Sequence, residues 1–221
     1  MKQFDGWMLP DHEEHLQFWM HDVNQRRHGR LSYQAHKYDL AVGYCKQKRV
    51  AVDIGAHVGL WAYQMAHDFE SVHCFEPMQE HAKCWRANMA GKSNCILHEC
   101  ALGKSEGYAM VETRTPDSSG DTGVSGFSVE PKPGHVPMYA LDRFELLAVD
   151  FMKVDCEGYE LPILQGAERT LLRCKPVVIV EQKPGMAGRY DMPAQGAVKF
   201  LKNLGATLKN EISGDFILAW E

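Results

Sequence analysis

The chain has 221 residues, of which 45% are hydrophobic, so it can bury the core of one α/β domain with an N-terminal extension. Its formal net charge of −5 and its lack of Lys/Arg runs argue against a nucleic-acid partner. No apolar stretch approaches the roughly 20 residues of a membrane span, and the first residues form no signal pattern, so no membrane partner is expected.

The N-terminal part, residues 1–45, is predicted to be a helical extension that acts as a cofactor lid or lies on the substrate side. Asp11 is a candidate N-cap for a short helix that ends near Met20. A second helix is predicted over residues 32–45, where apolar side chains are available for one face. The remaining residues, 46–221, are predicted to form a Rossmann-like domain.

From residue 50 onward, short apolar runs alternate with segments of helical periodicity. The predicted strands cover residues 50–52, 72–75, 96–99, 151–154 and 177–180. The predicted helices cover residues 60–67, 79–89, 160–173 with a break at Gly166, and 194–204. Residues 207–208 and 216–220 are predicted to close the sheet as an antiparallel hairpin. This alternation implies right-handed crossovers and a parallel sheet covered on both faces.

Residues 114–135 differ from the rest because Thr, Ser, Asp, Gly and Pro dominate their first half. This composition predicts a loop. The loop is either a disordered surface excursion or, since long loops in compact domains are often functional, a lid or binding loop.

The seven cysteines include no C-x-x-C pair, which predicts reduced thiols and a cytoplasmic protein. Several cysteines lie inside apolar runs and are explained best as small buried residues. A metal site at Cys95, His98 and Cys100 is disfavoured because structural zinc sites use tighter pairs.

A glycine-containing turn follows the first strand of the domain. Its pattern is Asp53-x-Gly55-x-x-x-Gly59, and Glu76 closes the next strand 23 residues after Asp53. Glycines let the backbone approach a ligand closely, and a carboxylate about 20 residues further on binds ribose hydroxyls. The turn alone is explained equally well as an ordinary tight turn. Together with Glu76 it predicts a site for an adenosine-containing cofactor.

The glycine spacing narrows the choice of cofactor. Dinucleotide sites usually read G-x-G-x-x-G, with a pyrophosphate at a helix N-terminus. Asp53 would repel a diphosphate, but it suits a ligand with an ammonium or sulfonium group. S-adenosylmethionine carries both groups and a ribose for Glu76, so it is the predicted cofactor. His57, between the glycines, is predicted to pack beside the cofactor in preference to acting as a base.

Five predicted strands end in a carboxylate. These residues are Asp53, Glu76, Glu99, Asp155 and Glu181. Ligands of open α/β sheets bind outside the carboxyl ends of the strands, so these side chains are expected near one edge. The first two are assigned to the cofactor. Asp155 and Glu181, with Glu157 close by, are the predicted catalytic residues on the substrate side.

Methyl transfer from a sulfonium is an in-line displacement, and a hydroxyl acceptor must also lose its proton. Amine-methylating sites often carry Asn/Asp-Pro-Pro-aromatic at the position of Asp155, but this run contains no proline. Acidic groups suit an oxygen nucleophile, either as a base or as ligands of a divalent ion such as Mg²⁺. The structural alternatives are that Asp155 caps the next helix and that Glu160 occupies its first turn.

Several motifs together resemble the FkbM family of S-adenosylmethionine-dependent methyltransferases. They are residues 52–59 (VDIGAHVG), 75–77 (FEP), 101–103 (ALG), 141–142 (LD), 152–160 (MKVDCEGYE) and 164–167 (LQGA). The resemblance covers roughly residues 33–220, and the block at 152–167 is its most specific part. It implies a class I methyltransferase (Rossmann-like) fold, an α/β fold with a seven-stranded, mostly parallel sheet.

The same resemblance assigns roles to residues within the matching motifs. It implies that Asp53, Gly55, Gly59 and Glu76 bind the cofactor and places Asp155 and Glu157 in the family's acidic motif. The other residues counted as cofactor-binding are His57, Pro77, Ala101 and, in the segment expected to close over the methionine end, Gln34. The family usually has Val where this chain has Cys156, which places a thiol beside the site.

The resemblance implies O-methylation, and the predicted acceptor is a hydroxyl of a sugar, glycan or related small molecule. Three alternatives remain: N-methylation of a nucleobase or protein side chain, a methyltransferase-like module that only binds a partner, and NAD-linked oxidoreduction. The module would require a degraded cofactor site, whereas Asp53, both glycines and Glu76 are present. The sequence carries no signal for a particular oligomeric state.

Overall fold

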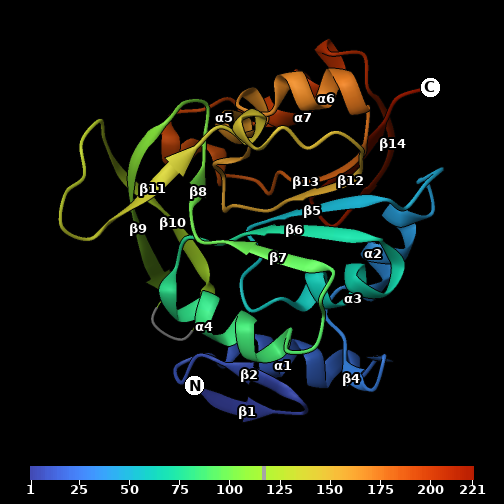
Figure 1. Cartoon of the computed structure of the whole chain (residues 1–221), viewed down its shortest axis with the longest axis vertical. Helices are drawn as coiled ribbons and strands as arrows, with labels where there is room; N and C mark the ends of the chain where they lie inside the picture. The colour runs from blue at the N-terminus through green and yellow to red at the C-terminus, as the bar shows by residue number, and fades with distance from the viewer. Residues whose placement is uncertain (116–117) are drawn as a thin grey trace.

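The computed structural model describes residues 1–115 and 118–221. A seven-stranded sheet forms its centre, with the strand order β14-β15-β13-β12-β5-β6-β7 (Figure 1). Its strands are β5 (Val50–Ile54), β6 (Ser71–Phe75), β7 (Cys95–His98), β12 (Val149–Val154), β13 (Val177–Glu181), β14 (Thr207–Ile212) and β15 (Asp215–Ala219). Neighbouring strands from β7 to β13 are parallel, whereas β15 is antiparallel to β13 and β14. The predicted fold class, including its closing hairpin, is confirmed.

Helices cover both faces of this sheet (Figure 1). One face carries α2 (Ala35–Val42), α3 (Leu60–Asp68) and α4 (Gln79–Asn88). The other carries α5 (Glu160–Gln165), α6 (Glu168–Cys174) and α7 (Gly196–Asn203). Side chains alternate between the two layers, so Val52 and Ile54 enter one core and Ala51 the other. Because both faces are buried, the strands read as continuous apolar runs.

The strand order reverses between β5 and β12. From β5 the chain proceeds outward to β6 and β7, and it later returns to β12 on the other side of β5. Connections therefore leave these two neighbours in opposite directions. Such a reversal opens a crevice outside the carboxyl ends of the two strands, which is where α/β proteins bind ligands.

Gly166 separates α5 from α6, at the predicted break. A Cβ atom at Gly166 would lie 2.0 Å from the carbonyl oxygen of Gly103, so the close approach of the two main chains requires glycine. The N-terminus of α6 is capped by a residue that is far away in the sequence. The Asp142 carboxylate accepts hydrogen bonds from the N–H groups of Arg169 and Thr170.

The prediction of a loop over residues 114–135 is wrong, because most of this stretch belongs to a second sheet of order β10-β9-β11-β8. Its strands are β8 (Ala101–Leu102), β9 (Gly107–Thr115), β10 (Ser118–Ser128) and β11 (His135–Tyr139). Residues 116–117 of the predicted loop lie outside the described residues. Antiparallel pairing with β9 makes β10 a strand despite its loop-like composition, and the pairing contains two register shifts.

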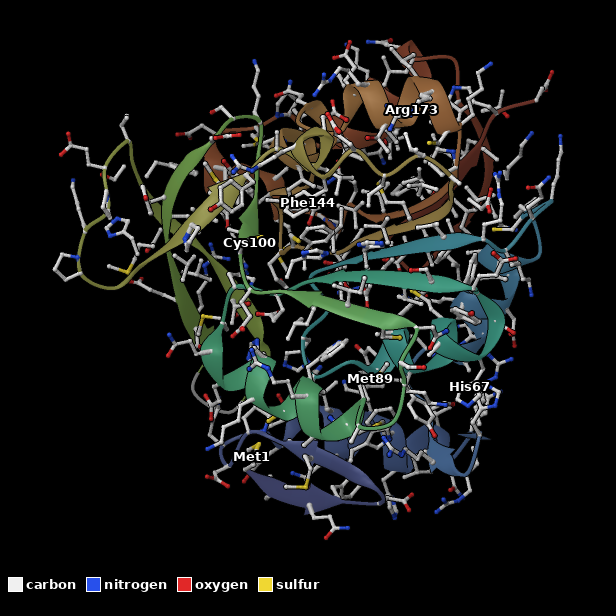
Figure 2. All side chains as sticks on the ribbon, viewed as in Figure 1. Met1, His67, Met89, Cys100, Phe144 and Arg173 are labelled. Atoms are coloured by element: carbon white, nitrogen blue, oxygen red, sulfur yellow. The ribbon has the colours of Figure 1, made fainter. Side chains whose placement is uncertain are left out.

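Aromatic packing joins the second sheet to the first. Phe144, labelled in Figure 2, ends the short 3-10 helix Leu141–Phe144. The centre of its ring lies 4.9 Å from that of Phe75 in β6 and 6.2 Å from that of Tyr139 in β11. The second sheet is thereby held beside the crevice.

The N-terminal 45 residues contain two helices near the predicted ones and also two β-hairpins, so the extension is helical only in part. Their elements are β1 (Lys2–Phe4), β2 (Trp7–Leu9), α1 (His15–Val23), β3 (Arg26–Arg27), β4 (Arg30–Leu31) and α2. Asp11 does not cap α1: the helix begins at His15, and the Asp11 carboxylate accepts a hydrogen bond from the N-terminal amine at 2.9 Å. None of the helices among the described residues is both long enough and apolar enough to cross a membrane.

We expect Phe151→Ala to lower the free energy of unfolding by about 3–5 kcal/mol, because it leaves a cavity in the core. Phe151 is 0% exposed, and its ring packs against Tyr38 and Phe69. Equilibrium unfolding in urea measures the change. Leu147→Ala, at a side chain 77% exposed, is the control and should shift the value by less than about 0.5 kcal/mol. Similar small losses in both variants would contradict the packing described.

Candidate active site

A cavity of about 420 Å³ opens at the carboxyl ends of β5, β6, β12 and β13. Its volume is typical of small-molecule sites, which span about 300–1,000 Å³. The strand ends form the floor, while α1, β10 and the segment after β13 supply the outer walls. The cavity therefore lies at the reversal of strand order, and the second sheet contributes one of its walls.

The glycine turn after β5 packs directly against the end of β12. Gly55 has a φ of +75°, and a Cβ atom there would lie 2.0 Å from the carbonyl oxygen of Asp155. The N–H groups of Gly55 and Ala56 both donate to the carbonyl oxygen of Phe75 in β6. Three neighbouring strand ends are thereby joined at one point.

Glu76, at the end of β6, is buried and held by three donors. One carboxylate oxygen accepts from the His57 N–H at 2.8 Å, and the other accepts from the Met78 N–H at 2.9 Å and lies 3.1 Å from Nδ1 of His81. Burial opposes its ionisation, but His81 and the two backbone donors outweigh burial and lower the pKa of Glu76. The carboxylate is thus ionised and fixed in orientation.

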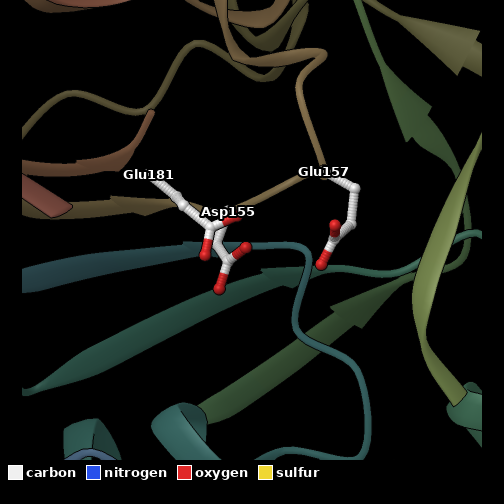
Figure 3. A group of neighbouring side chains, drawn as sticks. All are labelled: Asp155, Glu157 and Glu181. Atoms are coloured by element: carbon white, nitrogen blue, oxygen red, sulfur yellow. The ribbon is translucent and has the colours of Figure 1, made fainter. Parts of the chain in front are cut away.

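Three further carboxylates of the cavity lining lie close to one another (Figure 3). One oxygen from each of Asp155, Glu157 and Glu181 lies within 4.8 Å of the others. Burial, reinforced by the charge of Asp155, raises the pKa of Glu157 to about 7 and that of Glu181 to about 9. Near neutral pH the cluster therefore holds at least one proton.

Each member of this cluster has a basic neighbour. Lys183 contacts Glu181, and a guanidinium nitrogen of Arg189 lies 3.7 Å from Glu157. The ammonium of Lys153 lies 3.7 Å from Asp155. These cations offset part of the negative charge, but the pKa values of Glu157 and Glu181 are still raised, so the carboxylates still compete for a proton.

The identity of the fold family follows from comparison with known proteins. Residues 53–207 match the model of the methyltransferase FkbM domain. The chain belongs to the FkbM methyltransferase family. No curated protein matches it.

Solved structures resemble this FkbM-family chain at low sequence identity. A methyltransferase FkbM from Methylobacillus flagellatus KT has a TM-score of 0.53 and 17% identity, over 81% of this chain and 45% of that one. The precorrin-6y C5,15-methyltransferase of Geobacter metallireducens gives 0.52 and 13%, over 90% and 96%. The N-methyltransferase NodS of Bradyrhizobium japonicum, in complex with S-adenosyl-L-homocysteine, gives 0.50 and 10%, over 84% and 82%. These likenesses show the fold, and the chain spans under half of the first protein.

Most of the predicted site residues of this FkbM-family chain line the cavity. They are Gly55, His57, Glu76, Pro77, Ala101, Asp155, Glu157 and Glu181. The half-buried side chain of His57 lies beside His81, with ring centres 4.3 Å apart, and desolvation lowers its pKa well below the ordinary value. The ring at this position is therefore neutral.

Three predicted cofactor residues do not line the main cavity. Gln34 accepts a hydrogen bond from the indole N–H of Trp61 at 3.0 Å and borders a separate cavity of about 10 Å³. Gly59 is the N-cap residue before α3, with a φ of +92°. Asp53 is fully buried and does not line the cavity, although Lys153, its register partner on the same face of the sheet, does.

Several residues that line the cavity were not singled out individually, although some lie in residues 1–45 and 114–135, for which a lid or binding role was considered. They are His15, Leu16, Tyr33, residues 121–124 of β10, Lys153, Lys183, Met186 and Arg189. Only Lys153 carried a local signal, a cation inside an otherwise buried strand next to an acidic strand end. The others reach the cavity through tertiary packing.

Two neighbours of the acidic motif have structural explanations. Glu160 is 0% exposed and accepts hydrogen bonds from the N–H groups of Cys156 and Gly158, in agreement with its predicted place in the first turn of a helix. Cys156 lines the cavity, and burial raises the pKa of its thiol well above the ordinary value. The thiol is therefore protonated and acts as a packing group.

We expect Glu181→Gln to gain stability relative to the wild type as the pH rises from about 5 to about 9. The folded protein retains the Glu181 proton up to a pKa of about 9, whereas the ordinary value is 4.5, so wild-type stability falls across this window. Glutamine does not ionise, so the free energy of unfolding of Glu181→Gln minus that of the wild type should grow by about 2 kcal/mol or more over this pH range. Urea unfolding at several pH values measures it.

Glu211→Gln, at an exposed position in β14, is the control for this experiment. A difference between Glu181→Gln and the wild type that stays constant with pH would show that Glu181 ionises normally in the folded protein.

Proposed function

We propose that this chain transfers a methyl group from S-adenosylmethionine to a hydroxyl of a sugar, glycan or related small molecule. The observation that carries the proposal is one cavity with two acidic sites, Glu76 for a nucleoside and the cluster of Asp155, Glu157 and Glu181 for an acceptor. Membership of the FkbM methyltransferase family supports the reaction class. The nucleoside product bound to NodS supports the choice of cofactor.

The residues around Glu76 fit the cofactor. A carboxylate has about four acceptor positions, and the three donors at Glu76 leave capacity for a ribose hydroxyl. Pro77, Ala101 and Leu102 also line the cavity and would provide apolar contacts for an adenine ring. When bound, the cofactor supplies an electrophilic methyl group on a sulfonium.

Glu157 is the proposed base. Its pKa of about 7 lies near neutral pH, where a general base combines sufficient basicity with sufficient ionised population. Arg189 lies 3.7 Å from Glu157 and donates to Asp121 of β10 at 3.1 Å, so it ties the base to the outer wall. Glu181, with the higher pKa, keeps its proton and can orient the acceptor oxygen by donating a hydrogen bond.

Mg²⁺ is the competing occupant of the acidic cluster. Carboxylate oxygens are suitable ligands, and the three residues are close enough to share an ion. The basic neighbours Lys153, Lys183 and Arg189 favour a proton over a metal, because they already offset the carboxylate charges.

We also propose a role for the N-terminal segment, a cellular location and a class of acceptor. Residues 1–45 would form part of the cofactor and acceptor wall through His15, Leu16 and Tyr33. The seven free cysteines support a cytoplasmic location. The acidic composition supports a small-molecule or glycan acceptor over a nucleic acid.

We expect Glu76→Gln to weaken S-adenosylmethionine binding by about tenfold or more, because a charge-assisted hydrogen bond to the ribose becomes a neutral one. Isothermal titration calorimetry measures the affinity. Glu99→Gln, at an exposed carboxylate one strand further along the same sheet edge, should bind like the wild type. No heat with the wild type at millimolar ligand, or equal affinity in Glu76→Gln, would refute the proposed cofactor site.

We expect Glu157→Gln to lower kcat by about 100-fold or more. In the wild type kcat/KM should fall below about pH 7, because protonation of Glu157 removes the base. Transfer of labelled methyl groups to panels of glycans, peptides and nucleic acids measures activity. Label in peptides or nucleic acids would support N-methylation instead, and an EDTA-sensitive activity restored by Mg²⁺ would identify the cluster as a metal site.

A further inference from the structure

Lys153 places a positive charge inside the central sheet. It lies in β12, paired in register with Asp53 of β5, and the residue is only 6% exposed. Burial alone would lower the pKa of this lysine, but the attraction of Asp53 and Asp155 outweighs burial and raises it. A buried lysine that stays charged requires partners, and its partners here belong to two different strands.

The ammonium of Lys153 links the glycine turn to the acidic cluster. Its Nζ donates to the carbonyl oxygen of Gly55 at 2.8 Å and lies 3.7 Å from a carboxylate oxygen of Asp155. Lys153 and Asp155 both line the main cavity. One charged group therefore contacts the turn on the cofactor side and the carboxylate on the acceptor side.

Asp53 depends on the same ammonium. Its carboxylate is 0% exposed, and neither oxygen has a hydrogen-bond partner within residues 1–115 and 118–221. The Nζ of Lys153 lies 3.4 Å from one of these oxygens, which is an ion-pair distance. Burial raises the pKa of Asp53 to about 6, and Lys153 opposes that rise. Asp53 does not line the cavity, so a direct contact with a ligand there is not available to it.

We propose that Lys153 is a positioning residue that holds the Gly55 turn and the Asp155 carboxylate in their relative places, and that Asp53 is its buried counter-ion and does not contact the cofactor. The acidic residue of the glycine motif would then act on the cofactor only through Lys153. This inference rests on the proposed binding of S-adenosylmethionine in the main cavity.

A double-mutant cycle tests the inference. The proteins are the wild type, Asp53→Asn, Lys153→Met, the double variant and Lys153→Arg. Calorimetry gives the affinity for S-adenosylmethionine, and thermal unfolding gives the stability of each protein. Lys153→Met alone leaves the buried Asp53 carboxylate without its counter-ion, so this variant is expected to unfold at a lower temperature. The double variant replaces both charges by neutral groups and is expected to fold.

We expect Lys153→Met to weaken cofactor binding by about tenfold or more, and Lys153→Arg to stay within about threefold of the wild type. The double variant should regain much of the thermal stability but none of the affinity, since the Gly55 carbonyl still lacks its donor and Asp155 its ion-pair partner. Adding Asp53→Asn to Lys153→Met should change the affinity by less than about twofold. A merely structural role would restore affinity together with stability.

Lys37→Met provides a matched control. Lys37 and Asp215 form another buried pair, at 2.5 Å, but neither residue lines the main cavity. This variant should lose stability and keep its affinity within about twofold.

Two results would overturn the inference. An equal loss of affinity from Asp53→Asn in both backgrounds would mean that Asp53 acts on the cofactor independently of Lys153. Wild-type affinity in Lys153→Met would remove the positioning role. Failure of the wild type to bind S-adenosylmethionine is a different outcome, because it refutes the proposed cofactor itself and this inference with it.

Discussion

The site depends on the close contact between the glycine turn after β5 and the end of β12. The carbonyl oxygen of Asp155 occupies the space that a side chain on Gly55 would need, and Lys153 donates to the carbonyl of the same turn. Glu76 joins this contact through the N–H of His57. Two acidic sites of different character are thereby held at fixed places around one cavity, although they come from strands far apart in the sequence.

The two sites differ because their carboxylates have different surroundings. Glu76 is surrounded by donors, which keep it ionised despite burial. Glu181 is buried and Glu157 is half-buried near Asp155, and both compete with it for protons, so desolvation and like charge raise their pKa values. An ionised carboxylate suits a fixed ribose, whereas carboxyls that titrate near neutral pH suit proton transfer. One fold thus uses the same functional group for the two tasks of the proposed reaction.

Local patterns predicted the central sheet because its strands are buried on both faces and its helices have an apolar periodicity. The carboxylates at the strand ends were predictable once the strands were located, because parallel strands end at a common edge of the sheet. The second sheet was not predictable from composition: β10 is rich in Gly and Ser, and only its pairing with β9 makes it a strand. The burial of Asp53 was not predictable, because a carboxylate at a strand end reads the same in the sequence whether it reaches the cavity or is enclosed by its neighbours.

The most direct test of the account is a crystal structure of the protein with S-adenosyl-L-homocysteine. We expect the ribose hydroxyls to contact the carboxylate of Glu76 and the sulfur to face the cluster of Asp155, Glu157 and Glu181. A nucleoside bound outside this cavity, or bound in it with Glu76 turned away from the ribose, would contradict the account.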